Sequence, residues 1–236
     1  MIGICGCHRT GKTTLAKAMS MCVSDERYVP VEMKTASLLK DLGVTMKTKL
    51  KFEERLNVQD LLLKKYEEEY KWMSEDEEII RTTKDRNFTY VVDRTPIDVA
   101  AYLLAESNFQ TATNVSQSAV EQFKNFMSRH ISVTSKYIDM LVYVPIAINV
   151  VEENDKAPCN PIFMRHIDFL IQGMIHRYET MFDSSMPIFP WTIKIDEGMT
   201  GLLARTEFVN QNWMRLCNEE LKHSDDWMER VIANSN

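Results

Sequence analysis

The sequence predicts an α/β fold in which a parallel sheet is covered by helices on both faces. Five short apolar segments alternate with long segments of helical periodicity, as in sheets whose parallel strands are connected through helices. The 236 residues, 44% of them hydrophobic, are enough for one sizeable core. We therefore expect a single domain over residues 1–236. The expected strands are Ile2 to Cys5, Tyr28 to Val31, Phe88 to Val92, Met140 to Val144 and Thr192 to Ile195.

The intervening segments predict helices, and the third is the best marked at its start. Thr95 can cap it, Pro96 suits the first helical position, and Asp98 completes a capping box. Asp93 and Arg94 are therefore expected at the carboxyl end of the preceding strand, the edge where open parallel sheets bind ligands. The expected helices are Lys12 to Val23, Phe52 to Trp72, Pro96 to Glu106, Ser116 to Thr134, Pro161 to Met181 and Gly201 to Leu221.

Charge and cysteine content exclude several classes of protein. The formal net charge of −6 argues against nucleic-acid binding over the whole surface, because duplex affinity depends on neutralising phosphates. The five cysteines include no Cys-x-x-Cys pair, which predicts neither a disulfide framework nor a structural zinc and fits a reducing cytoplasm. The apolar runs predict neither a signal peptide nor a membrane span.

Residues 6–13, Gly-Cys-His-Arg-Thr-Gly-Lys-Thr, match the pattern of a phosphate-binding loop (P-loop) between an expected strand and an expected helix. Its two glycines let the backbone wrap closely around phosphates, Lys12 adds a positive charge, and Thr13 offers a hydroxyl to Mg²⁺. His8 fills a variable position and is expected to be a solvated bystander. The predicted ATP site consists of Gly6, Arg9, Thr10, Gly11, Lys12, Thr13 and Thr14.

A P-loop alone does not name a reaction, and the acid at the end of the third strand narrows the choice. Asp93 is placed where a carboxylate can hold Mg²⁺ together with Thr13. No Asp is followed by Gly three residues later, and no Asn/Thr-Lys-x-Asp segment appears, so a switch GTPase is disfavoured. The expected cofactors are ATP and Mg²⁺.

The run Asp93-Arg94-Thr95-Pro96-Ile97-Asp98 resembles P-loop nucleoside and nucleotide kinases, whose third strand ends in Asp-Arg. It looks especially like AAA-type kinase domains related to NadR-like ribosylnicotinamide kinases and to phage deoxynucleotide kinases. The resemblance implies a three-layer P-loop NTPase fold with strand order 2-3-1-4-5 and a helical lid. It also implies an ATP-dependent kinase whose acceptor is a nucleoside or a (deoxy)nucleotide, modified ones included.

The same resemblance implies roles for three charged side chains. Glu32, at the end of the second strand, would orient the acceptor hydroxyl or take its proton, unless it is an ordinary exposed acid. Arg94 would hold the acceptor or the transferring phosphoryl group through its planar fork, unless it forms a structural ion pair with Asp98. Arg165 is the candidate arginine of a lid expected at about residues 152–166.

Related kinases recognise the acceptor with a helix at the position of Phe52 to Trp72. On that helix Gln59 and Tyr66 are the candidate acceptor contacts, although an aromatic stripe at this spacing is more often core. On the helix after the lid, Phe163, Ile167 and Met174 belong to an apolar stripe, and Asp168 is expected on another face with Arg165.

Two further hypotheses about the function stay open. A basic segment beside Glu32 would suit a kinase that phosphorylates a hydroxyl on DNA, for example on a hydroxymethylated base. The other reading is a regulatory ATP-binding module with little turnover. The oligomeric state is open as well, a homodimer included. The lysines of the basic segment are Lys34, Lys40, Lys47, Lys49 and Lys51.

Overall fold

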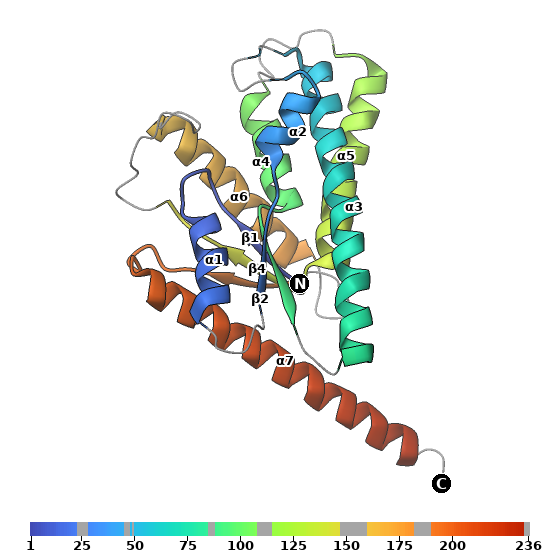
Figure 1. Ribbon diagram of the computed structural model, residues 1–236. Coiled ribbons are helices and arrows are strands. Elements are labelled where there is room, and N and C mark those ends of the chain that lie inside the picture. The colour runs from blue at the N-terminus through green and yellow to red at the C-terminus, as the bar shows by residue number, and fades with distance from the viewer. Residues whose placement is uncertain are drawn as a thin grey trace.

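A computed structural model describes residues 1–22, 28–44, 48, 50–84, 88–107, 115–146, 160–181 and 190–233 (Figure 1). Its centre is a five-stranded sheet in the order β2-β3-β1-β4-β5, with every neighbouring pair parallel. Both the α/β class predicted from the sequence pattern and the strand order implied by the resemblance to P-loop kinases are therefore confirmed. The strands are β1 (Ile2–Cys5), β2 (Tyr28–Glu32), β3 (Thr89–Asp93), β4 (Met140–Tyr143) and β5 (Trp191–Lys194).

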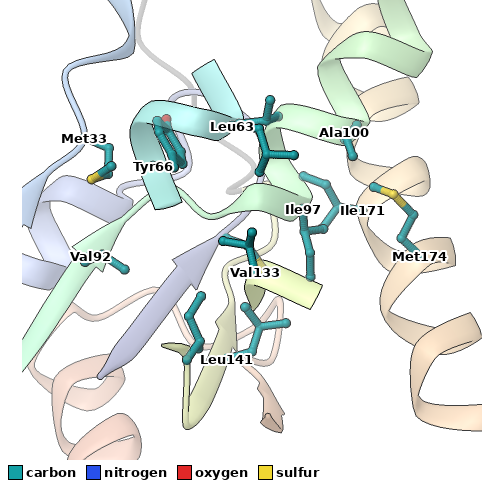
Figure 2. Close-up of a cluster of buried hydrophobic side chains, with 14 of the residues drawn as sticks. Met33, Leu63, Tyr66, Val92, Ile97, Ala100, Val133, Leu141, Ile171 and Met174 are labelled. Atoms are coloured by element: carbon teal, nitrogen blue, oxygen red, sulfur yellow. The ribbon is translucent and has the colours of Figure 1, made fainter. Parts of the chain in front are cut away.

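Helices cover both faces of this sheet, which forms the middle of three layers. Because side chains alternate along a strand, Leu141 and Tyr143 face one core while Met140 and Val142 face the other. The first core is closed by α3 to α6, and Figure 2 shows part of it; the second is closed by α1 and α7. The helices are α1 (Lys12–Cys22), α2 (Thr35–Asp41), α3 (Phe52–Lys84), α4 (Pro96–Glu106), α5 (Gln117–Tyr137), α6 (Pro161–Met181) and α7 (Leu202–Ala233).

Helix α3 continues to Lys84, well beyond the predicted end at Trp72. The acidic residues that follow Trp72 are used by the fold: Asp76 accepts a hydrogen bond from the Tyr90 hydroxyl, and Glu77 accepts one from the Tyr90 amide. These bonds fasten the second half of the helix to strand β3. Helix α7 likewise runs to Ala233 instead of Leu221, and the short helix α2 was not predicted.

None of the helices within the described residues is both long and apolar enough to cross a bilayer.

The side chain of His130, in α5, is completely buried between α5 and α6. Its Nε2 lies 2.6 Å from the hydroxyl of Tyr178, and its ring stacks on that of Phe126 at a centroid distance of 6.1 Å. Within the described part of the chain, its Nδ1 has no hydrogen-bond partner. Burial lowers the pKa of His130 to about 4 from the ordinary value of 6.5.

We predict that His130 makes stability depend on pH in acid. Between pH 6.5 and about pH 4 the unfolded chain protonates this histidine while the folded chain does not, so the free energy of unfolding falls as pH falls. The contribution is at most about 3 kcal/mol. Urea unfolding of the wild type and of His130→Leu at several pH values measures it, and equal pH slopes in the two proteins would contradict the assignment.

Candidate functional site

The P-loop connects β1 to α1, and both of its glycines have positive φ angles. Gly6 has φ +148° and Gly11 has φ +89°. A Cβ at Gly6 would lie 2.4 Å from the carbonyl oxygen of Val144, because strand β4 ends directly beneath the loop. The loop therefore approaches β4 closely, and its residues lie at the carboxyl end of the sheet, as the sequence predicts.

Lys12, the first residue of α1, is held inside this loop. Its Nζ donates hydrogen bonds to the carbonyl oxygens of Gly6 and Cys7, both at 2.7 Å, and the side chain is buried. Burial lowers the pKa of Lys12, and the nearby carboxylates of Asp98 and Asp93 oppose that shift. The ammonium group is thus placed in the loop by main-chain acceptors and has acidic groups around it.

The other predicted loop residues differ in exposure. Arg9 is half-buried with a left-handed backbone (φ +64°), and Thr14 is exposed. Thr10 is buried, and its hydroxyl donates to the carbonyl oxygen of Cys7 at 3.0 Å. Behind the loop, the buried guanidinium of Arg205 in α7 lies 3.5 Å from the Thr10 carbonyl oxygen. Contact with ATP stays a prediction for Arg9, Thr10 and Thr14.

Asp98 fastens the P-loop to the start of α4. One carboxylate oxygen accepts the amide of Gly6 at 3.0 Å, and the other accepts the amide and hydroxyl of Thr95 at 2.7 and 2.9 Å. The predicted capping box is present, with Pro96 in the first turn. Burial raises the pKa of Asp98, which Lys12 and these hydrogen bonds oppose. The contact of Asp98 with the P-loop was not predicted from the sequence, which suggested a capping role and an ion pair with Arg94.

We predict that Asp98→Asn weakens both the fold and the nucleotide site. An amide nitrogen cannot accept, so at least one bond to Gly6 or Thr95 is lost and the cost is about 2 kcal/mol of unfolding free energy. The melting temperature should fall, and the Kd of Mg·ATP should rise. If only the melting temperature fell, Asp98 would act on the helix cap and not on the loop.

Thr13 and Asp93, the predicted metal ligands, are in direct contact. The Thr13 hydroxyl donates to one carboxylate oxygen of Asp93, and the other carboxylate oxygen is buried with no partner in the described part of the chain. A hydroxyl and a carboxylate are the protein ligands that Mg²⁺ takes beside ATP phosphates. The described residues contain no larger cluster of metal-binding side chains, and this pair fits a phosphate-bound magnesium ion.

Glu32 and Arg94 lie next to Asp93, as predicted. Glu32 is paired with Asp93 in the β2–β3 register and is exposed. Arg94 is half-buried, and its guanidinium carbon lies 6.0 Å from the ring centroid of Tyr102. Within the described residues, no ion pair joins Arg94 to Asp98, whose oxygens are taken by Thr95 and Gly6. The structural ion pair considered for Arg94 is therefore not formed.

The lid predicted at about residues 152–166 lies only partly within the described residues, which resume at Asn160. Arg165, in α6, is exposed and lies 3.8 Å from the carboxylate of Asp168. Asp168 was expected on an outer face and is instead buried, because it accepts hydrogen bonds from the Tyr143 hydroxyl at 2.6 Å and from Gln172 at 3.1 Å. The role of Arg165 in a lid stays a prediction.

Both candidate acceptor contacts on α3 are buried. Tyr66 is fully enclosed, and its hydroxyl shares a 2.6 Å hydrogen bond with that of Thr35 at the start of α2. Gln59 lies two turns earlier on the stripe that also contains Leu56 and Leu63. Figure 2 shows Tyr66 beside Leu63 over the end of β3. Their contact with an acceptor stays a prediction.

His8 is not the solvated bystander that the sequence suggested. Its side chain is buried, and its Nδ1 lies 2.8 Å from the hydroxyl of Tyr102 on α4. The centroid of its ring lies 6.4 Å from the ring centroid of Phe163 on α6. The burial has a tertiary cause, since α4 and α6 both pack against this side of the loop. No signal in the sequence pointed to Tyr102.

No protein-family model matches this sequence, and no curated protein matches it either. Among solved structures, the chain is similar to thymidylate kinase from Candida albicans, with a TM-score of 0.57 and 14% identity over 93% of this chain and 91% of that one. It is also similar to deoxyadenosine kinase from M. mycoides with bound dATP, with a TM-score of 0.52 and 11% identity over 89% and 97% of the two chains. The chain shares the α/β fold of these two enzymes. The finer resemblance to NadR-like ribosylnicotinamide kinases stays a prediction from the sequence.

Proposed function

We propose that the chain is an ATP- and Mg²⁺-dependent kinase that phosphorylates a nucleoside or a (deoxy)nucleotide, modified ones included. One observation carries the proposal: the Thr13–Asp93 pair at the mouth of the P-loop adjoins Glu32 and Arg94 at the same edge of the sheet. A phosphate donor site and two residues suited to an acceptor thus share one edge. The likeness in fold to a thymidylate kinase and a deoxyadenosine kinase supports this assignment.

The chemistry follows from the residues at that edge. The P-loop amides and Lys12 bind the ATP phosphates. Thr13 and Asp93 would hold Mg²⁺, which would offset part of the phosphate charge when bound. An acceptor oxygen attacks the γ-phosphorus, the bond from that phosphorus to the β–γ bridging oxygen breaks, and ADP leaves. Glu32 takes the proton when the acceptor is a hydroxyl; when the acceptor is already a phosphate, no base is needed and Glu32 binds the sugar. Arg94 stabilises the charge on the transferring group.

The test is a coupled ADP-release screen across nucleosides, nucleotides and oligonucleotides, with Lys12→Ala as the control for contaminating kinases. The proposal expects ADP formation that requires Mg²⁺ and one class of nucleoside or nucleotide, and that disappears in the control. ATP binding without acceptor-dependent ADP formation would replace it by the regulatory ATP-binding module.

The salt dependence of activity distinguishes a small acceptor from DNA. Of the basic segment, Lys34, Lys40 and Lys51 lie within the described residues, whereas Lys47 and Lys49 lie outside them. A mononucleotide reaches one or two of these lysines, so kcat/KM should change little between low and high salt. DNA binding would weaken steeply as the salt concentration rises. Each lysine removed would reduce the slope of log K against log salt concentration by about one unit. Strong, salt-sensitive transfer to oligonucleotide alone would exclude the small acceptor.

A further inference from the structure

The backbone of Arg94 is in a conformation that arginine rarely adopts. Its φ is +85°, although it follows a regular strand and precedes the cap of α4. Such a conformation costs about 1–3 kcal/mol and persists only where neighbouring contacts impose it. The Arg94 amide donates to the carbonyl oxygen of Ile4 in β1 at 3.0 Å, which fixes one side of the residue.

The other side of the residue is fixed by Tyr70 of α3. The Tyr70 hydroxyl donates to the carbonyl oxygen of Arg94 at 2.9 Å. Tyr70 is completely buried, and its ring packs against Tyr66 and Tyr137 at centroid distances of 6.1 and 6.3 Å. Burial raises the pKa of Tyr70, so it keeps the proton that it donates. The donor is therefore rigid, and the carbonyl is held in place by a side chain 24 residues away.

The guanidinium of Arg94 has a separate support in Tyr102. Its central carbon lies 6.0 Å from the Tyr102 ring centroid, within the range of a cation–π contact. The hydroxyl of the same tyrosine accepts the His8 amide at 3.2 Å and lies 2.8 Å from His8 Nδ1. Tyr102 therefore contacts the P-loop with its hydroxyl and the arginine with its ring.

We propose that Tyr70 and Tyr102 are positioning residues for Arg94: Tyr70 holds its left-handed backbone, and Tyr102 sets the guanidinium relative to the P-loop. The proposal rests on the proposed function, in which Arg94 contacts the acceptor or the transferring phosphoryl group. A reacting geometry has to be held within a fraction of an ångström, and a misplacement of about 1 Å can cost a hundredfold in rate. Tyr70 holds the backbone of Arg94, and Tyr102 holds its guanidinium. Because Tyr102 also contacts His8 of the P-loop, it connects the proposed donor site with the proposed acceptor site.

Tyr70→Phe tests the backbone support, because it removes only the hydroxyl. We expect kcat/KM for the acceptor to fall roughly tenfold or more while the Kd of Mg·ATP stays unchanged. Tyr28→Phe is the matched control, because Tyr28 is also buried and its hydroxyl donates to Asn210 at 2.6 Å. Tyr28 begins β2, whereas the candidate site lies where that strand ends, at Glu32. The control should lose similar stability and keep wild-type kinetics. Equal kinetics in both variants would overturn the role of Tyr70.

A double-mutant cycle with Arg94→Ala separates positioning from a general loss of structure. If Tyr70 acts through Arg94, Tyr70→Phe should have no further effect on kcat/KM in the Arg94→Ala protein. Effects that simply multiply would show that Tyr70 acts elsewhere and would overturn the proposal.

Tyr102 is tested by two substitutions that remove its two contacts separately. Tyr102→Phe keeps the ring but loses the hydroxyl to His8, so the Kd of Mg·ATP should rise severalfold and acceptor use should change less. Tyr102→Leu also removes the ring beneath Arg94, and acceptor kcat/KM should fall by roughly a further tenfold. Identical kinetics in the two variants would overturn the role of the ring.

Crystal structures of the wild type and of Tyr70→Phe test whether Tyr70 positions Arg94, independently of any catalytic activity. We expect Arg94 at positive φ in the first and at negative φ, with its guanidinium away from Tyr102, in the second. An unchanged Arg94 in Tyr70→Phe overturns the inference even if the protein is a kinase. If Arg94 adopts a negative φ in Tyr70→Phe but the protein shows no acceptor-dependent ADP formation, the positioning role of Tyr70 is supported and the proposed function is rejected.

Discussion

Replacing Lys12 by alanine is expected to lower kcat/KM for phosphoryl transfer by roughly a thousandfold, because a preorganised charge at the transferring phosphate is lost. The Lys12 ammonium is already inside the P-loop, where it donates to the carbonyls of Gly6 and Cys7. We expect it to exchange these acceptors for phosphate oxygens when ATP binds. Steady-state ADP release at saturating Mg²⁺ measures the loss.

Lys17→Ala is the matched control for this substitution. Lys17 lies on the exposed side of the same helix, and its removal should leave kcat/KM unchanged. The circular dichroism spectrum of Lys12→Ala should match that of the wild type, because only loop contacts are lost. Turnover near the wild-type level in Lys12→Ala would reject the P-loop as the donor site.

The sheet was predictable because each strand is a short apolar run with its own boundaries. Ile2 to Cys5 is buried at every position, and an unbroken apolar run is what a central parallel strand requires. Helix α4 was predicted with its ends correct, since Thr95, Pro96 and Asp98 form a local capping signal. The continuation of α3 beyond Trp72 was not predicted, because the contacts of Asp76 and Glu77 with Tyr90 of β3 are tertiary.

The candidate site was predictable in the same local sense. Lys12 and Thr13 belong to one contiguous motif, and Asp93 follows from its place at the end of a strand, so the Thr13–Asp93 contact agrees with the prediction. The supports of Arg94 were not predictable, because Tyr70 and Tyr102 are ordinary members of helical apolar faces. Only the packing of α3 and α4 over the ends of the strands reveals that their hydroxyls point to main-chain groups.

Asp168 shows the same limit in a different place. Helical periodicity put this acid on an outer face, because the apolar stripe of α6 alone defined its inner side. The Tyr143 hydroxyl at the end of β4 and the amide of Gln172 provide donors that make burial of its carboxylate tolerable. A buried acid satisfied by a distant tyrosine has no signature in a helical pattern.

Asp93→Asn is expected to reduce activity by roughly a hundredfold at low Mg²⁺ and to raise the Mg²⁺ concentration needed for half-maximal rate. The substitution keeps the shape of the side chain and an oxygen that accepts the Thr13 hydroxyl, so the fold should be retained. It removes the negative charge that favours a divalent cation, at the place where one Asp93 oxygen is buried without a partner among the described residues. Asp60→Asn is the control and should leave the Mg²⁺ dependence unchanged, because this half-buried acid of α3 pairs with Lys64 and Arg129, which are not residues of the candidate site. Titrating the rate with Mg²⁺ decides the matter: a half-maximal concentration equal to that of the wild type would mean that Asp93 does not hold the metal.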